Sequence, residues 1–280
     1  MKFCIVGTGR CGTRLLRSML NDHPDIFVFN ETHWMPELYN RFGTMATTTR
    51  EMLDVIARTR HVNGEAVTQF DHQEFLAEIG NPRTTDVAHL CNSLGMFHAR
   101  KNGKSVWADK TPDYGYFSSV LQVYWPDCKI IHLIREGTAV ARSMANHPGY
   151  QALASMKQVF WCPMALDYVG KKTKFPLQPM HAYAELWYHR LVRARNEATR
   201  LKPGTYLEIR HEDILENPSD QMSKLARFVD LDLDRAWLNN TATAIDLRKV
   251  KKDAPTGILN HFSDRHIELL GELGYATKEV

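Results

Sequence analysis

A glycine-rich segment near the start of the chain carries the residues best suited to chemistry. It reads Gly7-Thr8-Gly9-Arg10-Cys11-Gly12-Thr13-Arg14-Leu15-Leu16 and connects a short apolar run to a helical pattern. A turn of this kind leaves backbone N–H groups free at the positive end of a helix, where phosphate-like anions bind. The sequence therefore predicts an anion site at this turn, with Arg10 adding a positive charge.

One interpretation of this turn is a dinucleotide-binding loop. Gly7, Gly9 and Gly12 match the G-x-G-x-x-G spacing, and Glu31 lies 19 residues after the last glycine, where the acid that binds the ribose is expected. This interpretation would make the protein an NAD(P)-dependent oxidoreductase. It gives no special role to Arg10.

A nucleoside triphosphatase loop fits less well. Gly7 and Gly12 have the required spacing, but Thr13-Arg14 stands where that motif has Lys followed by Ser or Thr. The main phosphate and magnesium ligands of such a loop are therefore missing. A third interpretation, a 5′-phosphosulfate held by Arg10 and the hydroxyl of Thr13, requires no metal.

A second candidate anion site follows the apolar run at residues 129–134. Arg135 stands at the end of this expected strand, and Ser143 follows eight residues later in a helical pattern. These two side chains can hold a phosphate from two sides, with the guanidinium forming charge-assisted hydrogen bonds. A dinucleotide fold predicts neither residue.

Taken together, the two motifs resemble those of sulfotransferases that use 3′-phosphoadenosine 5′-phosphosulfate (PAPS). The first loop of that family reads G-x-x-[RK]-[ST]-G-[ST]-[ST]-x-[LW]. This chain departs from it at Cys11 and Arg14, which would weaken side-chain contacts but not backbone contacts. The resemblance implies that Arg135 and Ser143 bind the 3′-phosphate. It also implies that the 5′-phosphosulfate is bound by Gly9, Arg10, Cys11, Gly12, Thr13 and Arg14.

Two weaker resemblances concern the rest of the nucleotide. Arg210-His211-Glu212-Asp213-Ile214, shortly before Asn217-Pro218, resembles the family phrase R-Y-E-D-L, which implies that the ring of His211 lies near the adenine. A helix-edge histidine is the alternative. The family also closes the 3′-phosphate site with a late basic loop, for which Lys251, Lys252 and Gly257 are the candidates, and a solvated charge run is the alternative.

Two further phrases resemble the sulfotransferases related to the heparan sulfate enzymes. Phe29-Asn30-Glu31-Thr32-His33-Trp34 is similar to K-E-x-H-F, which implies that Glu31 is the general base and that His33 positions it or the acceptor. Trp107-Ala108-Asp109-Lys110-Thr111-Pro112-Asp113-Tyr114 is similar to E-K-[ST]-P-x-Y. That similarity implies that Lys110 contacts the sulfuryl group or the acceptor. Arg10 would stabilise the charge on the leaving phosphate.

Short apolar runs in the sequence indicate the strands that must position these residues. The runs at 3–6, 26–29, 105–107, 129–134 and 205–209 alternate with helical patterns at 138–145, 183–201 and after 217. Continuous apolar runs are typical of parallel strands that are covered on both faces. We therefore expect an α/β fold with a central parallel sheet flanked by helices. The resemblance implies the P-loop-like sulfotransferase fold with helical insertions.

One domain over residues 1–280 is expected, with segments 35–100 and 147–180 as insertions that form a lid on the acceptor side. The 280 residues include 35 Lys and Arg against 32 Asp and Glu, a net charge of +3 that argues against nucleic-acid binding. No apolar stretch of about 18 residues occurs, so no membrane association is expected. The five cysteines form no CxxC pair, which favours a reducing, cytoplasmic location.

The resulting expectation is a cytoplasmic enzyme that sulfates a hydroxyl, or alternatively an amine, of a small molecule such as a secondary metabolite. PAPS is the expected donor, and no metal is expected. A homo-oligomer is possible. Two alternatives remain open at this stage: the NAD(P)-dependent oxidoreductase, and an inactive nucleotide-binding module that keeps Arg135 and Ser143 but does not need Glu31.

Overall fold

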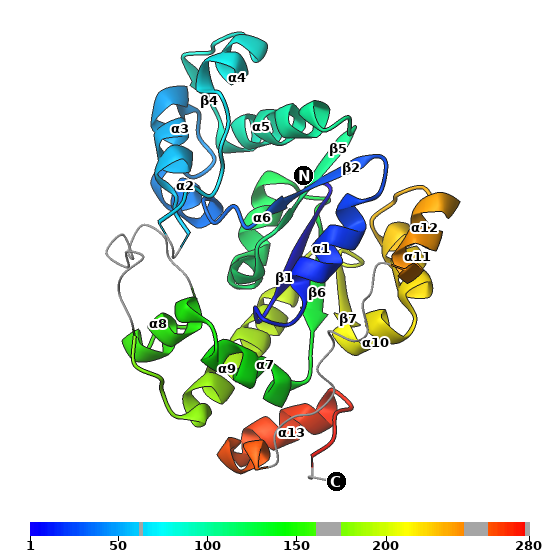
Figure 1. The fold of residues 1–280 in the computed structure, drawn as a ribbon. Helices are drawn as coiled ribbons and strands as arrows, with labels where there is room; N and C mark the ends of the chain where they lie inside the picture. Colours follow the sequence, from blue (N-terminus) through cyan, green and yellow to red (C-terminus); the bar gives the residue numbers. More distant parts are fainter. Residues whose placement is uncertain (62–63, 161–174, 244–256, 278–280) are drawn as a thin grey trace.

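The main sheet of the molecule has five parallel strands (Figure 1). The computed structural model describes residues 1–61, 64–160, 175–243 and 257–277. All five apolar runs of the sequence form strands, and the predicted α/β class with a central parallel sheet is confirmed. The strands are β1 (Phe3–Gly7), β2 (Ile26–Asn30), β5 (Val106–Lys110), β6 (Lys129–Ile134) and β7 (Tyr206–Arg210).

The order of the strands, β2-β5-β1-β6-β7, differs from that of dinucleotide-binding folds. In those folds the second strand lies beside the first, so the acid at its end comes next to the glycine turn. Here β5 pairs with both β1 and β2, and therefore lies between them. The strand β5, which ends at Lys110, therefore separates the strand that carries the glycine turn from the strand that leads to Glu31. This topology does not favour the NAD(P) alternative.

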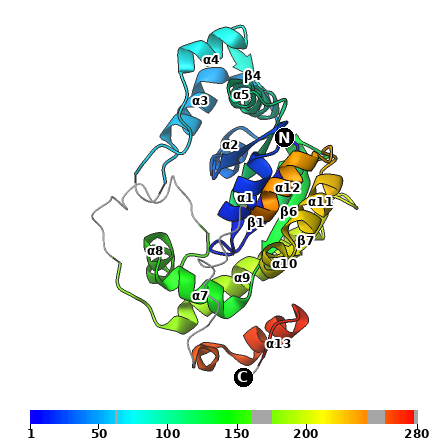
Figure 2. The ribbon, with the colours of Figure 1, turned by 45° about the vertical axis from the view of Figure 1, so that its right-hand side comes forward.

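Helices cover the sheet and make up most of segment 35–100 (Figures 1 and 2). Segment 35–100 holds α2 to α5 and a short antiparallel pair, β3 (Thr47–Thr48) with β4 (Thr84–Thr85). The other helices are α1 (Thr13–Asn21), α6 (Ser118–Tyr124), α7 (Gly137–Ala145), α8 (Pro148–Met156), α9 (Met180–Ala198), α10 (His211–Glu216), α11 (Pro218–Phe228), α12 (Arg235–Thr243) and α13 (Asp264–Glu272). The helices of segment 35–100 are α2 (Met35–Phe42), α3 (Thr49–Arg58), α4 (His72–Glu78) and α5 (Val87–Lys101), and the short 3₁₀ turns are η1 (Pro112–Tyr116) and η3 (Ile258–His261).

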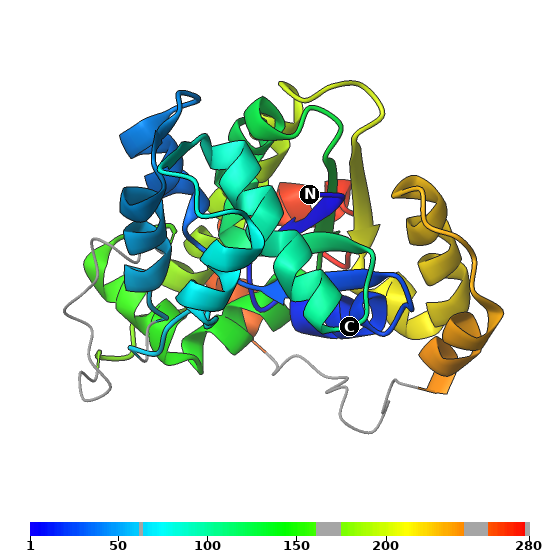
Figure 3. The same ribbon diagram turned by 90° about the horizontal axis from the view of Figure 1, so that it is seen from above.

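Alternate residues of β1 belong to two different cores. Phe3 and Ile5 pack in a cluster with residues of α1, α9 and α11, whereas Cys4 and Val6 pack in a cluster with residues of α2, α3 and α5. Successive side chains of a strand point to opposite faces, so a strand covered on both faces is apolar throughout. In Figures 1 and 3 helices α11 and α12 lie to one side of the sheet, away from the lobe formed by α2 to α5.

Two helices form where sequence patterns predicted them. The predicted helix at 183–201 corresponds to α9, which buries Tyr183, Trp187 and Leu191. The helix α11 begins at Pro218 with Asn217 as its N-cap residue. Among the described helices, none is both long and apolar enough to cross a membrane.

Candidate active site

The turn after β1 is built from backbone conformations that favour glycine. Gly9 has a φ of 73°, Arg10 a φ of 56° and Gly12 a φ of 99°, all in the left-handed region. Gly12 is the N-cap of α1, and its carbonyl accepts hydrogen bonds from the N–H groups of Leu15 and Leu16. Within the described residues no side chain caps α1, and its first turn contains no acidic residue. The positive end of the helix is therefore available to an anion.

Two aromatic side chains pack against the glycines of this turn. A Cβ atom on Gly9 would overlap the hydroxyl oxygen of Tyr150, and one on Gly12 would overlap Nδ1 of His211. Tyr150 comes from α8, and its hydroxyl lies 3.5 Å from the carbonyl oxygen of Thr8. Glycine is therefore required here by space as well as by conformation.

A Gly12→Ala variant should lose both stability and nucleotide binding. The added Cβ atom clashes with His211, and the left-handed conformation costs about 1–3 kcal/mol for a residue other than glycine. Gly103→Ala is the matched control, because Gly103 also has a positive φ (66°) but a Cβ atom added there would meet no other atom within 4 Å. Thermal unfolding and calorimetry with 3′,5′-ADP would measure both effects. Equal behaviour of the two variants would show that the contact with His211 is unimportant.

The structure brings the two predicted anion motifs together. The Nε atom of Arg10 donates a hydrogen bond to the hydroxyl oxygen of Ser143 at 3.1 Å, and Arg135 donates one to the carbonyl oxygen of Arg10 at 3.3 Å. The carboxylate of Glu136 caps α7 by accepting from the N–H groups of Thr138 and Ala139 at 2.8 and 2.7 Å. This cap fixes the start of the helix that carries Ser143, directly after Arg135. Two cationic side chains and a hydroxyl thus meet at one sheet edge.

His211 follows β7 and lies beside this group of residues. The residue is 7% exposed, and its Nδ1 atom has no hydrogen-bond partner in the described part of the chain. Burial, together with the charge of Arg135, lowers the pKa of His211 to about 4. The ring is therefore neutral at physiological pH, which suits packing against the glycine turn and would suit packing against a base.

The pKa of His211 predicts a loss of stability in mild acid. The unfolded chain binds a proton at this histidine below its pKa of about 6.5, whereas the folded protein does so only near pH 4. The free energy of unfolding is therefore highest above about pH 6.5, and it falls as the pH is lowered toward 4. The loss is about 3 kcal/mol at most. His211→Phe keeps an aromatic ring but cannot titrate. Urea unfolding at pH 7 and at about pH 4.5 should therefore show a smaller fall in the free energy of unfolding for this variant. An equal fall in both proteins would contradict the assignment.

The remaining residues predicted to bind the nucleotide differ in how far they are exposed. Cys11 is fully buried, and burial raises the pKa of its thiol, so the thiol is not exposed to a ligand. Thr13 is 5% exposed, and Arg14 is exposed on α1. Lys251 and Lys252 lie outside the described residues. Gly257 has a φ of 89° and precedes η3.

A second group of charged side chains lies at the ends of β2 and β5. Asn30 is the register partner of Lys110, and the N–H group of Glu31 donates to the carbonyl oxygen of Lys110 at 2.7 Å. The ammonium of Lys110, which is 1% exposed, donates to Oε1 of Glu31 at 2.5 Å. Nε2 of His33 lies 3.5 Å from Oε2 of the same carboxylate. The predicted residues Glu31, His33 and Lys110 therefore form one cluster around the Glu31 carboxylate.

Electrostatics keep the Glu31 carboxylate ionised. Burial alone would raise its pKa, but the hydrogen bond to His33 and the positive charge of Lys110 outweigh this and hold the pKa of Glu31 well below its usual range. Glu31 and His33 also have φ angles of 65° and 54°, which are unfavourable for residues other than glycine. Strained conformations of this kind occur preferentially at functional sites.

A buried polar network holds the Glu31 loop against the loop after β5. The N–H group of Thr32 donates to Oγ1 of Thr111 at 2.9 Å, and the hydroxyls of Thr32 and Tyr114 lie 2.6 Å apart. Thr111 in turn donates to Asp109 at 2.6 Å. The Tyr114 hydroxyl also accepts from the N–H group of Met35 at 3.1 Å. The Thr and Tyr of the Lys-Thr-Pro-Asp-Tyr phrase thus position the strained loop.

Arg190 connects the two groups and was missed by the sequence analysis. This side chain is 1% exposed, forms an ion pair with Asp113, and donates from Nε to the carbonyl oxygen of Thr8 at 2.5 Å. Asp113 lies 3.7 Å from Nδ1 of His33. The signal was present in the sequence, because residue 190 lies three positions after Trp187 on the buried face of the helix. An arginine on such a face requires a buried partner.

Three other residues reach the site from segments 35–100 and 147–180. Tyr150 packs on Gly9 as described above, and burial raises its pKa. Burial and the neighbouring charge of Arg10 lower the pKa of His147, the N-cap residue of α8. His61, beyond α3, lies against Glu31 and His33. No sequence motif marks these residues. They lie far from the strand ends in the sequence, and only the folding of the chain places them beside the site.

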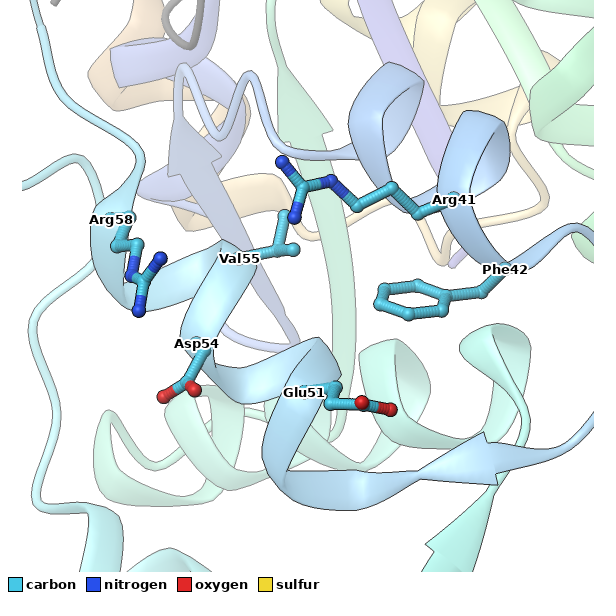
Figure 4. Close-up of a pocket in the computed structure, with 6 residues that line it drawn as sticks. All are labelled: Arg41, Phe42, Glu51, Asp54, Val55 and Arg58. Atoms are coloured by element: carbon cyan, nitrogen blue, oxygen red, sulfur yellow. The ribbon is translucent and has the colours of Figure 1, made fainter.

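A separate pocket lies between α2 and α3 (Figure 4). Two of its charged groups are already engaged within the lobe: Arg41 pairs with Glu37, and Glu51 accepts a hydrogen bond from Thr48. It holds none of the predicted site residues. The chemistry is therefore expected at the sheet edge and not in this pocket, which is lined by Arg41, Phe42, Glu51, Asp54, Val55 and Arg58.

Comparisons with known proteins concern the family and the fold of the chain. Residues 3–235 match the sequence model of the sulfotransferase family. A Drosophila melanogaster protein-tyrosine sulfotransferase is 22% identical over 89% of this chain, and the match spans only 43% of that protein. A putative protein-tyrosine sulfotransferase of Caenorhabditis briggsae is 24% identical over 84% of this chain and 67% of its own length. The structure of the sulfotransferase domain from the curacin biosynthetic pathway has the same fold, with a TM-score of 0.59 at 16% identity and coverage of 98% of this chain and 97% of that domain.

Proposed function

The chain belongs to the sulfotransferase family, and on this premise we propose that it transfers a sulfuryl group from PAPS to a hydroxyl group of a small molecule, with 3′,5′-ADP as the other product. The observation that carries the proposal is the meeting of two sets of groups at one sheet edge. Arg10, Arg135 and Ser143 suit the phosphates of the donor. Glu31 and Lys110 suit proton transfer and charge stabilisation at the acceptor.

In the proposed reaction the acceptor oxygen forms a bond to sulfur while the bond from sulfur to the bridging phosphate oxygen breaks. The acceptor proton passes to Glu31, and the electrons of the broken bond remain on the phosphate oxygen. The charge of Arg10 and the N–H groups at the start of α1 stabilise this oxygen. We assign Lys110 to the sulfuryl oxygens. When its ammonium turns toward them, the pKa of Glu31 rises, and Glu31 becomes a stronger base at the moment it is needed.

We place the acceptor between segments 35–100 and 147–180. Support comes from the residues that each segment sends to the sheet edge. His61 of the first lies against Glu31, and Tyr150 of the second lies against Gly9. A metabolite alcohol is the proposed acceptor class, since the curacin domain belongs to a biosynthetic pathway. Assays with an amine or a tyrosine peptide as acceptor would separate this proposal from the other acceptor classes.

An Arg135→Ala variant should bind 3′,5′-ADP about 10- to 150-fold more weakly, since a hydrogen bond to a charged group contributes about 1.5–3 kcal/mol. Isothermal calorimetry measures this directly. Arg100→Ala is the control, because Arg100 is an exposed residue of α5 paired with Glu78, and its removal should leave the affinity unchanged. Unchanged affinity of the Arg135 variant would remove its assigned role at the 3′-phosphate. Binding of NAD but not of 3′,5′-ADP by the wild type would overturn the donor assignment.

A further inference from the structure

One cluster at the site has a composition that proton transfer does not require. A carboxylate oxygen of Glu31, a ring nitrogen of His33 and a ring nitrogen of His61 all lie within 4.8 Å of one another. Glu31 and His33 come from the loop after β2, whereas His61 lies beyond α3, next to the bridge between Arg60 and Ala66. His33 is 8% exposed and His61 is half-buried. Two imidazoles and one carboxylate are the protein ligands of many zinc enzymes.

Charged neighbours of the cluster orient its donor atoms. Lys110 occupies Oε1 of Glu31, which leaves Oε2 facing Nε2 of His33 at 3.5 Å. Nδ1 of His33 faces Asp113 at 3.7 Å, and Asp113 is held by the buried Arg190. A histidine that binds a metal through one nitrogen usually directs the other to a carboxylate, which fixes the ring and its tautomer. His33 has this arrangement.

The distances also suit a small divalent cation. Zinc bonds of about 2.0–2.2 Å place tetrahedral ligand atoms about 3.4 Å apart. Glu31 and His33 already have nearly this separation, and His61 lies within 4.8 Å of both, so a modest rotation of its half-buried ring would complete three ligands. The fourth position would remain open to water or to the acceptor oxygen.

We propose that Glu31, His33 and His61 form a binding site for Zn²⁺ or a similar divalent transition metal, and that occupation of this site inhibits sulfuryl transfer. The metal takes the lone pair of Glu31 that would accept the acceptor proton, so the inhibition rests on the proposed function, whereas metal binding does not. The ammonium of Lys110 opposes a second positive charge nearby, so the affinity should be moderate. The transfer reaction itself uses no metal in this proposal.

Titration of the whole chain with Co²⁺, followed by visible absorption, tests the site without any need for turnover. We expect one equivalent of Co²⁺ to bind and to show the intense d–d absorption bands of a tetrahedral site. His61→Ala should weaken Co²⁺ binding at least about tenfold, since the loss of even an outer-shell partner of a metal ligand costs about this much in affinity. His89→Ala is the matched control, because His89 lies on α5, outside the cluster. Wild-type affinity in the His61 variant, or a thiolate-to-cobalt charge-transfer band, would overturn the proposal.

An assay of sulfuryl transfer by the wild-type enzyme in the presence of Zn²⁺ separates metal binding from inhibition. Binding of Co²⁺ together with inhibition by Zn²⁺ at the same concentrations supports both the metal site and the inhibition. Binding without inhibition would retain the metal site and contradict the role of Glu31 as the base. If Co²⁺ does not bind, the metal site is wrong, and the proposed sulfuryl transfer is unaffected.

Discussion

A Glu31→Gln variant is expected to lose about two to four orders of magnitude in the rate of sulfuryl transfer, the usual contribution of a general base. Glutamine keeps the size of the side chain but cannot accept the acceptor proton. The nucleotide residues Arg10, Arg135 and Ser143 lie beyond the ends of other strands, so the affinity for 3′,5′-ADP should remain near that of the wild type. Single-turnover kinetics with PAPS and calorimetry with 3′,5′-ADP would measure the two quantities separately.

A loss of stability in the Glu31→Gln variant must be distinguished from a loss of catalysis, because Lys110 is affected as well. Its ammonium is buried and loses its anionic partner in the Glu31 variant, so the thermal stability of the variant must be measured alongside its rate. Glu37→Gln removes a carboxylate from α2 that pairs with the half-exposed Arg41, and it should leave transfer unchanged. A folded Glu31→Gln protein with near-normal transfer would contradict the assignment of the base.

The second large effect is structural: Arg190→Met should reduce the free energy of unfolding by about 3–5 kcal/mol, because it removes the arginine of the buried ion pair with Asp113. The variant also removes the hydrogen bonds to the carbonyl oxygens of Thr8 and Val159. Urea denaturation measures the loss. The expected result includes weaker nucleotide binding, since Thr8 begins the turn that would hold the donor.

Two further variants make this prediction specific. Arg193→Met removes a half-exposed arginine from the same helix, where its pairing with Glu197 should contribute less than about 1 kcal/mol. The double variant Arg190→Met/Asp113→Asn removes both charges and should recover part of the lost stability. A loss below about 1 kcal/mol for Arg190→Met, or no recovery in the double variant, would contradict the account of the buried pair.

Local sequence patterns predict much of this fold. The five strands are short apolar runs, and α9 and α11 follow from helical spacing and from the Asn217-Pro218 start. Parallel strands place their carboxyl ends at one edge, so Arg10, Glu31 and Arg135 could be expected near one another from their positions after strands. Their relation to specific ligands came from resemblance to family motifs.

The parts of the site that the sequence did not predict depend on strand order and on long-range contacts. No local pattern says that β5 lies between β1 and β2, and this order places Lys110 against Glu31. A lysine at a strand end is usually exposed, yet this one is buried because it pairs with a carboxylate. His61 and Tyr150 reach the site from segments 35–100 and 147–180, where no motif marks them. Arg190 is the exception, because a charged residue on an apolar helix face is a detectable signal.

Mass spectrometry after incubation of the protein with isotopically labelled PAPS and a panel of alcohol, amine and tyrosine-peptide acceptors tests the proposed sulfuryl transfer. We expect an acceptor to gain one labelled sulfuryl group, together with an equal amount of 3′,5′-ADP, and Glu31→Gln to give neither above background. Tight binding of 3′,5′-ADP with no transfer to any acceptor of the panel would contradict the proposed transfer and would favour a nucleotide-binding module without catalytic activity.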